Sequence, residues 1–153
     1  MSITGEMDSA SVKLRADDFF AIQNRYARYN LCSDGGDVEG YVDCFTEEGG
    51  LEVQPLGFKV VGRSHLREYK DSDVKSRGNR YFRHWNGSLH LEASAPGTVR
   101  GRCYLVEYTG ESSQLPAITY VGVYDDKIVK CADGKWRFSH RLLVLDAATW
   151  KPK

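Results

Sequence analysis

The chain has 153 residues, of which 41% are hydrophobic and 27% charged, and these values are typical of a single globular domain. Its 21 basic and 21 acidic side chains give a formal net charge of zero, which favours neither a nucleic acid nor an anionic membrane as partner. No apolar run approaches the roughly 20 residues of a membrane-spanning helix, and the N-terminus lacks the pattern of a secretory signal. We therefore expect a cytoplasmic protein without nucleic-acid or membrane partners.

Residues 1–15 are polar and without periodicity, so they predict a flexible arm before one domain over residues 16–148 and a short tail over 149–153. The four cysteines form no close pair and no cluster with histidine at zinc-ligand spacing. We expect no metal site, and we interpret the cysteines as small buried or half-buried hydrophobic residues rather than redox groups.

From residue 17 onward, apolar side chains recur at intervals of three and four residues, which predicts an amphipathic helix. Asp17 or Asp18 is placed to cap its N-terminus, and Gly35-Gly36 ends it. Asp37 can cap a second, short helix. The acidic and glycine residues 47–50 are interpreted as a turn.

Residues 51–62 predict two short extended segments, and a polar helix is expected over about residues 64–77. The remaining half is rich in β-branched and aromatic residues, with turn signals at residues 95–97, 110–113 and 132–134. Successive strands joined by short turns pair antiparallel. The chain therefore predicts an α+β domain in which helices cover one face of a curved antiparallel sheet.

No local catalytic motif is present, so candidate site residues are polar side chains on otherwise apolar surfaces. Asp34 lies on the same stripe of the predicted helix as Tyr26 and Asn30, because the three are spaced i, i+4 and i+8. It is either part of a site or a solvated residue before two glycines. His84 lies among aromatic residues on a predicted strand, with Asn86 on the same face. It is either functional or a half-exposed strand histidine.

Arg141 is the third candidate, on the last predicted strand. Strict alternation puts it on one face with Arg137 and Ser139, whereas Trp136, Phe138 and His140 share the other face. Only one of these faces can line the interior. If the face of Arg141 lines a pocket, the guanidinium would hold an anion; otherwise surface pairing is its usual role.

The segment AIQNRYARYNLCSDGGDVEGYVDCF resembles the opening helices of the SnoaL-like branch of the nuclear-transport-factor-two-like superfamily. GRSHLREY is similar to the start of the third helix in that family, and DGKWRFSHRLLVLD is similar to its last strand. The resemblance extends over roughly residues 15–146. It implies a cone-shaped α+β barrel, with N-terminal helices packed on a strongly curved antiparallel sheet that encloses a pocket.

Within this superfamily, the pattern is most similar to scytalone dehydratase and hexachlorocyclohexane dehydrochlorinase, which use an Asp–His dyad. Asp34 and His84 match the dyad positions, and the resemblance places Arg141 inside the pocket, near the departing group. Two features differ from these relatives. No second histidine occurs on the middle strand, and Tyr29 replaces a polar or basic helix residue. The identity of the substrate is therefore left open.

An imidazole, with a reference pKa of about 6.5, can act as a general base near neutral pH when a carboxylate fixes its tautomer. Elimination, double-bond isomerisation and aldol-type cyclisation all begin with such a proton abstraction, without a cofactor. The expected function is a dehydratase- or dehydrohalogenase-like lyase or isomerase acting on a small hydrophobic molecule, ring-containing ones included. The candidate substrate-binding residues are Tyr26, Tyr29, Asn30, Trp85, Asn86, Tyr104 and Tyr120.

The alternative is a non-catalytic ligand-binding or assembly subunit, like the small subunit of ring-hydroxylating dioxygenases. An enzyme would place Asp34 and His84 within hydrogen-bond distance inside a cavity, whereas an assembly subunit would expose a broad apolar face. In either case the outer face of such a sheet tends to be covered by a copy of itself, so we expect a homodimer or homotrimer.

Overall fold

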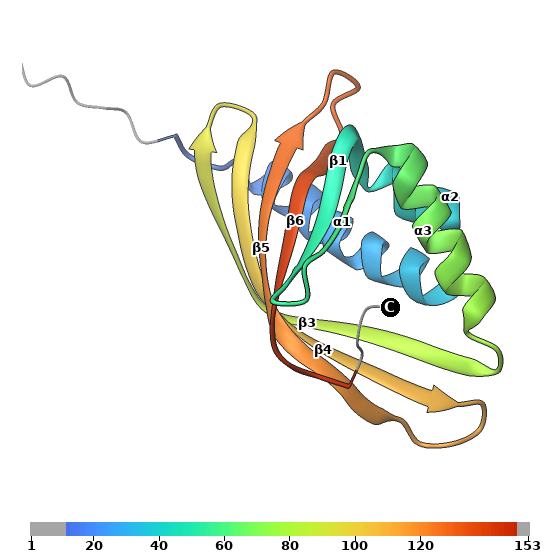
Figure 1. Ribbon diagram of the computed structural model, residues 1–153. Coiled ribbons are helices and arrows are strands. Elements are labelled where there is room, and N and C mark those ends of the chain that lie inside the picture. Colours follow the sequence, from blue (N-terminus) through green and yellow to red (C-terminus); the bar gives the residue numbers. More distant parts are fainter. Residues whose placement is uncertain (1–11, 150–153) are drawn as a thin grey trace, which may run out of the picture.

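The computed structural model describes residues 12–149 (Figure 1). The first helix, α1 (Ala16–Gly35), is followed by the short α2 (Val38–Asp43), and α3 (Arg63–Ser76) comes later in the chain. Residues 1–11 and 150–153, which include most of the expected arm and tail, lie outside the described residues. Among residues 12–149, no helix is long and apolar enough to cross a membrane.

The helix ends follow the sequence signals with one exception. Gly36 has a φ of 75°, the left-handed conformation that ends α1, and the side chain of Asp37 accepts the backbone N–H of Gly40 at the start of α2. Neither Asp17 nor Asp18 caps α1, because the N-cap position is Arg15. Both acids lie in the first turn, where the helix dipole favours negative charge, and Asp18 accepts the indole N–H of Trp136 at 2.9 Å.

Six strands form one curved sheet in the order β2-β1-β6-β5-β4-β3. They are β1 (Phe45–Gln54), β2 (Phe58–Val61), β3 (Arg80–Ala95), β4 (Thr98–Glu111), β5 (Ala117–Lys130) and β6 (Trp136–Ala148). The α+β class and the antiparallel meander from β3 to β6 are confirmed. The sheet is nevertheless mixed and unclosed, because β1 pairs in parallel with β6. Turn signals fix only the direction of strands that follow one another, and these two are far apart in the chain.

The predicted turn at residues 47–50 is wrong, since β1 runs through it. A Cβ on Gly49 would lie 2.7 Å from the carbonyl oxygen of Phe138, and one on Gly50 would lie 2.7 Å from that of Val60. The pairing of β1 with β6 also shifts register between Phe45 and Gly50. The two glycines therefore allow close backbone contact with both neighbouring strands through a β-bulge, rather than a turn.

A second irregularity decides which side chains of β6 face inward. Ile128 pairs with Phe138, but the preceding Lys127 pairs with His140, so Ser139 is an extra residue. This bulge shifts the alternation by one residue, and both Phe138 and Arg141 are 0% exposed. The two faces that strict alternation kept apart thus contribute to the same interior. His140 lies on the outer side instead, 3.4 Å from Glu52.

The three helices lie on the concave side of the bent sheet, as Figure 1 shows. Their apolar faces and the inward side chains of the strands form one core, in which Ile22, Tyr41, Phe45, Leu66 and Phe138 are completely buried. The four cysteines are free, and three of them belong to this core, as the sequence predicts. The outer side of the sheet is left uncovered by any described helix.

Candidate functional site

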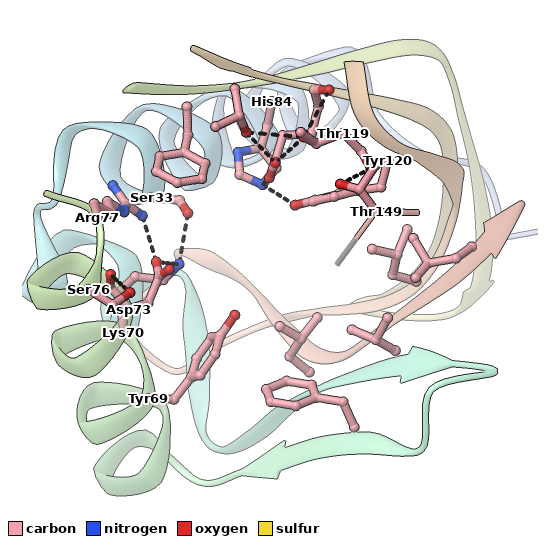
Figure 2. Close-up of a pocket in the computed structure, with 18 of the residues that line it drawn as sticks. Ser33, Tyr69, Lys70, Asp73, Ser76, Arg77, His84, Thr119, Tyr120 and Thr149 are labelled. Atoms are coloured by element: carbon pink, nitrogen blue, oxygen red, sulfur yellow. Dashed lines mark hydrogen bonds and ion pairs between the residues drawn. The ribbon is translucent and has the colours of Figure 1, made fainter. Parts of the chain in front are cut away.

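A cavity of about 720 Å³ opens between the concave face of the sheet, α1 and α3 (Figure 2). This volume is within the range of pockets that bind small organic molecules. One part of its wall is mostly apolar and comes from the sheet and from α3: Leu51, Val53, Phe58, Tyr69, Leu143 and Leu145. Two separate groups of polar side chains make up much of the rest, one around His84 and one around Lys70.

Asp34 and His84 lie in direct contact. Asp34 is in the last turn of α1, and its Oδ1 is 2.5 Å from Nδ1 of His84 on β3. Its Oδ2 accepts the backbone N–H of His84 at 2.9 Å. One carboxylate thus holds both the ring and the main chain of the histidine. Because an ionised carboxylate only accepts hydrogen bonds, this contact requires the proton on Nδ1 and directs Nε2 to the other side of the ring.

The Nε2 atom of His84 meets two further groups. It lies 2.8 Å from the hydroxyl of Tyr120 and 3.3 Å from Oε2 of Glu107. The sheet register explains this meeting, because Glu107 of β4 is the direct partner of His84 on one side and of Tyr120 on the other. All three side chains line the cavity. We refer to Asp34, His84, Glu107 and Tyr120 as the pocket cluster.

Glu107 is held as firmly as Asp34. Its side chain is only 6% exposed, and its Oε1 accepts hydrogen bonds from Thr119 at 2.6 Å and Thr109 at 3.0 Å. The remaining oxygen, Oε2, is thereby directed to the imidazole. Burial, followed by the nearby charge of Glu107, raises the pKa of Tyr120 well above its ordinary value. Tyr120 therefore stays a neutral phenol that can donate a hydrogen bond.

Arg141 lies in a different place from the one the resemblance implies. Its Nε and Nη2 donate to the two carboxylate oxygens of Asp126 at 3.1 and 3.0 Å, and Tyr26 donates to Asp126 at 2.7 Å. Arg141 and Asp126 are 0% and 1% exposed, and Arg141 is not among the residues that line the cavity. We refer to Tyr26, Asp126 and Arg141 as the core cluster.

Aromatic rings enclose the guanidinium of Arg141. Its central carbon lies within 3.8–5.1 Å of four ring centroids, those of Tyr26, Tyr29, Tyr124 and Phe138. Burial disfavours its charge, but the facing Asp126 raises the pKa of Arg141 well above its ordinary value. Tyr29 and Tyr124 themselves line the cavity. Arg141 thus contacts the inner side of the pocket wall without reaching its surface.

The remaining residues predicted to bind substrate divide into four groups. Tyr29 and Tyr120 line the cavity, whereas Tyr26 belongs to the core cluster. Asn30 donates its amide to the side-chain oxygen of Asn86 at 2.6 Å, which connects α1 to β3 outside the cavity. These two asparagines therefore position β3 rather than face the pocket.

Trp85 and Tyr104 point away from the pocket, which corrects their predicted place in the site. They are 69% and 61% exposed on the outer side of the sheet. Because side chains alternate along a strand, placing His84 inside puts Trp85 outside. On β4, the inward positions are Cys103, Leu105 and Glu107, so Tyr104 faces outward.

Sequence reasoning missed Glu107 and the second polar group, which consists of Lys70, Asp73 and Arg77 on or just after α3. Lys70 and Arg77 are 4% and 8% exposed. A signal for each was available. Glu107 is two residues beyond Leu105 and four beyond Cys103, so alternation puts it on the same inward face of the strand. Lys70 follows the buried Leu66 by four residues, which puts it on the same face of the helix. Among the described residues, no cluster of histidine, cysteine and acidic side chains could hold a metal ion.

Comparison with known proteins agrees with this architecture. Residues 15–142 match the family model of the SnoaL-like domain. A protein of unknown function from Mycobacterium tuberculosis, Rv3472, is 32% identical, with a TM-score of 0.76 over 87% of this chain and 74% of that chain. A search of curated proteins finds no significant match.

Two further solved structures share the fold. ActVI-ORFA from Streptomyces coelicolor is 21% identical, with a TM-score of 0.76 over 84% of this chain and 96% of that chain. A protein from Novosphingobium aromaticivorans that is provisionally assigned as a scytalone dehydratase is 20% identical, with a TM-score of 0.77 over 90% of both chains. At these identities the likeness concerns the fold alone.

Proposed function

Because the chain belongs to the SnoaL-like domain family, we propose that it is a lyase or isomerase in which His84 removes a proton from a carbon beside a carbonyl or a leaving group. The observation that carries this proposal is the orientation of one ring. Asp34 occupies Nδ1 of His84, and Nε2 is directed to the cavity wall beside Tyr120 and Glu107. A carboxylate in this position fixes the tautomer and stabilises the imidazolium that forms.

The proposed reaction begins when a substrate C–H approaches Nε2 of His84. The hydroxyl of Tyr120, which contacts Nε2 at 2.8 Å, turns away toward Glu107, and Nε2 accepts the proton. The electron pair of the broken C–H bond forms a carbon–carbon double bond. Beside a carbonyl, the C=O π pair moves to the oxygen and gives an enolate; beside a leaving group, that group departs with its bonding pair. The imidazolium then lies between the carboxylates of Asp34 and Glu107, which stabilise its charge.

The fate of the proton distinguishes the two reaction types. In a lyase, the imidazolium returns it to a departing hydroxyl, which leaves as water. In an isomerase, it returns the proton to a second carbon of the same substrate. The apolar and aromatic wall, including Phe58, Tyr69 and Tyr124, suits a flat hydrophobic substrate in either case. The provisional dehydratase from Novosphingobium aromaticivorans, which has the same fold, makes elimination of water the first reaction to test.

Exchange of carbon-bound protons tests the base without knowledge of the leaving group. Ring ketones such as 2-tetralone are incubated with the protein in D₂O, and loss of the α-proton signal is followed by NMR. The wild type should accelerate exchange for at least one ketone. His84→Ala should lower that exchange rate about 10²–10⁴-fold. His90→Ala is the matched control, because His90 is exposed on the same strand.

The proposal is contradicted if His84→Ala exchanges as fast as His90→Ala, or if no ketone of the series exchanges faster with the wild type than with His84→Ala. The second outcome would favour the alternative of a ligand-binding or assembly subunit. One observation supports that alternative as well, namely the exposed Trp85 and Tyr104 on the outer face.

The same outer face supports our proposal that the protein forms a homodimer or homotrimer. Trp85 and Tyr104 continue along the sheet register into Val106 and Val123, and Val123 pairs with the 41% exposed Val144. Covering such a face with a second copy would bury apolar side chains of several strands. Sedimentation showing a monomer at tens of micromolar would contradict this proposal, and it would leave the proposed chemistry untouched.

A further inference from the structure

The second polar group of the pocket wall carries an excess of positive charge. Lys70 and Arg77 are 4% and 8% exposed, and both contact the same oxygen, Oδ2 of Asp73, at 3.0 and 2.6 Å. Although burial opposes ionisation, these two cations hold the pKa of Asp73 below its ordinary value, so it carries one negative charge. Two buried positive charges thus share one negative charge.

Among residues 12–149, no second carboxylate is in direct contact with Lys70 or Arg77, although the charge of Asp34 also acts on Lys70. Nζ of Lys70 donates to the hydroxyl of Ser33 at 3.0 Å, and Nη1 of Arg77 donates to the backbone carbonyl of Asp34 at 3.1 Å. Nε of Arg77 is buried without a hydrogen-bond partner among the described residues. Both carboxylate oxygens of Asp34 are engaged by His84.

A buried, incompletely neutralised cation is costly, because burial removes the water that would stabilise it. Burial lowers the pKa of the Lys70 ammonium group, although the charges of Asp73 and Asp34 act in the opposite direction. A ligand that brings negative charge to this wall would offset the excess of positive charge, so the site favours an anion over a neutral molecule.

The rest of the cavity indicates to what the anionic group of such a ligand is attached. In Figure 2, the group of Lys70, Asp73 and Arg77 lies apart from the group of His84, Thr119 and Tyr120, and unlabelled apolar side chains line the opposite side. Arg80 joins the cationic side of the lining, with its Nε and Nη2 bound to backbone carbonyls. The occupant therefore has an acidic end and an apolar body.

We propose that Lys70, backed by Arg77, binds a carboxylate of the substrate, so that an apolar carboxylic acid spans the pocket with its reacting carbon at His84. A carboxylate supplies negative charge and two acceptor oxygens, which suit the ammonium and guanidinium donors of this wall. This inference rests on the proposed function for its reference to a reacting carbon. The binding preference itself is independent of any turnover.

Matched pairs of ligands test the preference for an acid. Benzoate, 2-naphthoate and anthracene-2-carboxylate, each with its uncharged amide, are titrated into the protein by calorimetry near neutral pH. At least one acid should bind about tenfold to hundredfold more tightly than its amide, as the loss of a charge-assisted hydrogen bond implies. In Lys70→Met the ratio should approach one, while the affinity for the amide is kept.

Lys75→Met is the matched control, because Lys75 lies on the same helix with a 74% exposed side chain and should retain the preference. Thermal melting of each variant checks that it is folded. If Lys70→Met does not fold, two other measurements test the preference for an acid. They are the ratio of acid to amide affinity in the wild type and the same ratio in Arg80→Gln, whose side chain also lines the cavity. Equal affinities of every acid and its amide in the wild type, or a preference that survives in Lys70→Met, would overturn the proposal.

The same titrations with His84→Ala separate the two proposals. A preference for acids that persists in this variant, in a protein that fails the proton-exchange test, would support the carboxylate site and contradict the proposed chemistry. Exchange without any preference for acids would support the base and contradict the carboxylate site.

Discussion

The pocket cluster and the core cluster are both buried groups of charged and phenolic side chains, yet they differ in what surrounds them. His84 and Glu107 border a cavity of about 720 Å³, and Nε2 of His84 is directed to its wall. Arg141 is enclosed by four aromatic rings, and the hydrogen bonds of its guanidinium end on Asp126. Members of both clusters were candidate site residues from the sequence alone or from the family resemblance. The difference teaches that burial of charge does not distinguish a site from a core, whereas access to a cavity does.

The largest effect expected from this comparison concerns Asp34. Asp34→Asn keeps the shape of the side chain but presents an amide to Nδ1 of His84, which favours the wrong tautomer. The rate of proton exchange should fall by about 10²–10⁴-fold, with little change in stability. Adding His84→Ala should cause no comparable further loss, because the two residues act as a unit. NMR exchange kinetics measure both effects, and additive losses would show that the chemistry lies elsewhere.

The core cluster should respond in stability instead. Arg141→Met would leave Asp126 buried without its partner, at an expected cost of about 3–5 kcal/mol in the free energy of unfolding. Urea denaturation measures this loss, with Arg102→Met on the exposed side of β4 as the control. A variant that keeps its stability but loses proton exchange would place Arg141 in the chemistry and break the comparison.

Two tyrosines sharpen the contrast at a smaller scale. Tyr26→Phe removes a 2.7 Å hydrogen bond to the Asp126 carboxylate, which should lower the free energy of unfolding by about 1.5–3 kcal/mol. Exchange by the folded protein should be unchanged. Tyr120→Phe should leave stability nearly intact and alter the exchange rate by up to about tenfold, the equivalent of one ordinary hydrogen bond. If Tyr26→Phe altered the proton-exchange rate and Tyr120→Phe lowered the stability, the division into pocket cluster and core cluster would be wrong.

Local signals in the sequence were sufficient for most of the fold. The glycine at position 36 and the aspartate at position 37 act through their own backbone and nearest neighbours, so their roles as helix end and cap could be predicted. The parallel pairing of β1 with β6 could not be predicted, because no residue near either strand indicates which strand it pairs with. The same limit applies to Gly49 and Gly50, whose close contacts come from Phe138 and Val60.

Prediction of the site failed where one residue changes the phase of a strand. Alternation assigned Phe138 and Arg141 to opposite faces, but the extra Ser139 brings both inside, and His140 moves outward. Glu107 was missed for another reason. Its place in the site follows only from the register that puts it between His84 and Tyr120, and this register depends on three strands together. The proximity of Asp34 to His84 came from the family resemblance rather than from spacing.

The double contact of Asp34 with His84 has a consequence for self-association. β3 is the outermost strand of the sheet, so one side of its backbone lacks a strand partner. At His84, side chains of α1 take that place: Asp34 accepts the backbone N–H, and the amide of Asn30 lies 3.4 Å from the backbone carbonyl. The carboxylate that orients the imidazole thus also shields an open edge against the addition of a foreign strand. A short apolar residue at position 34 would remove the orientation and the shield together, so loss of chemistry there would be accompanied by a tendency to aggregate.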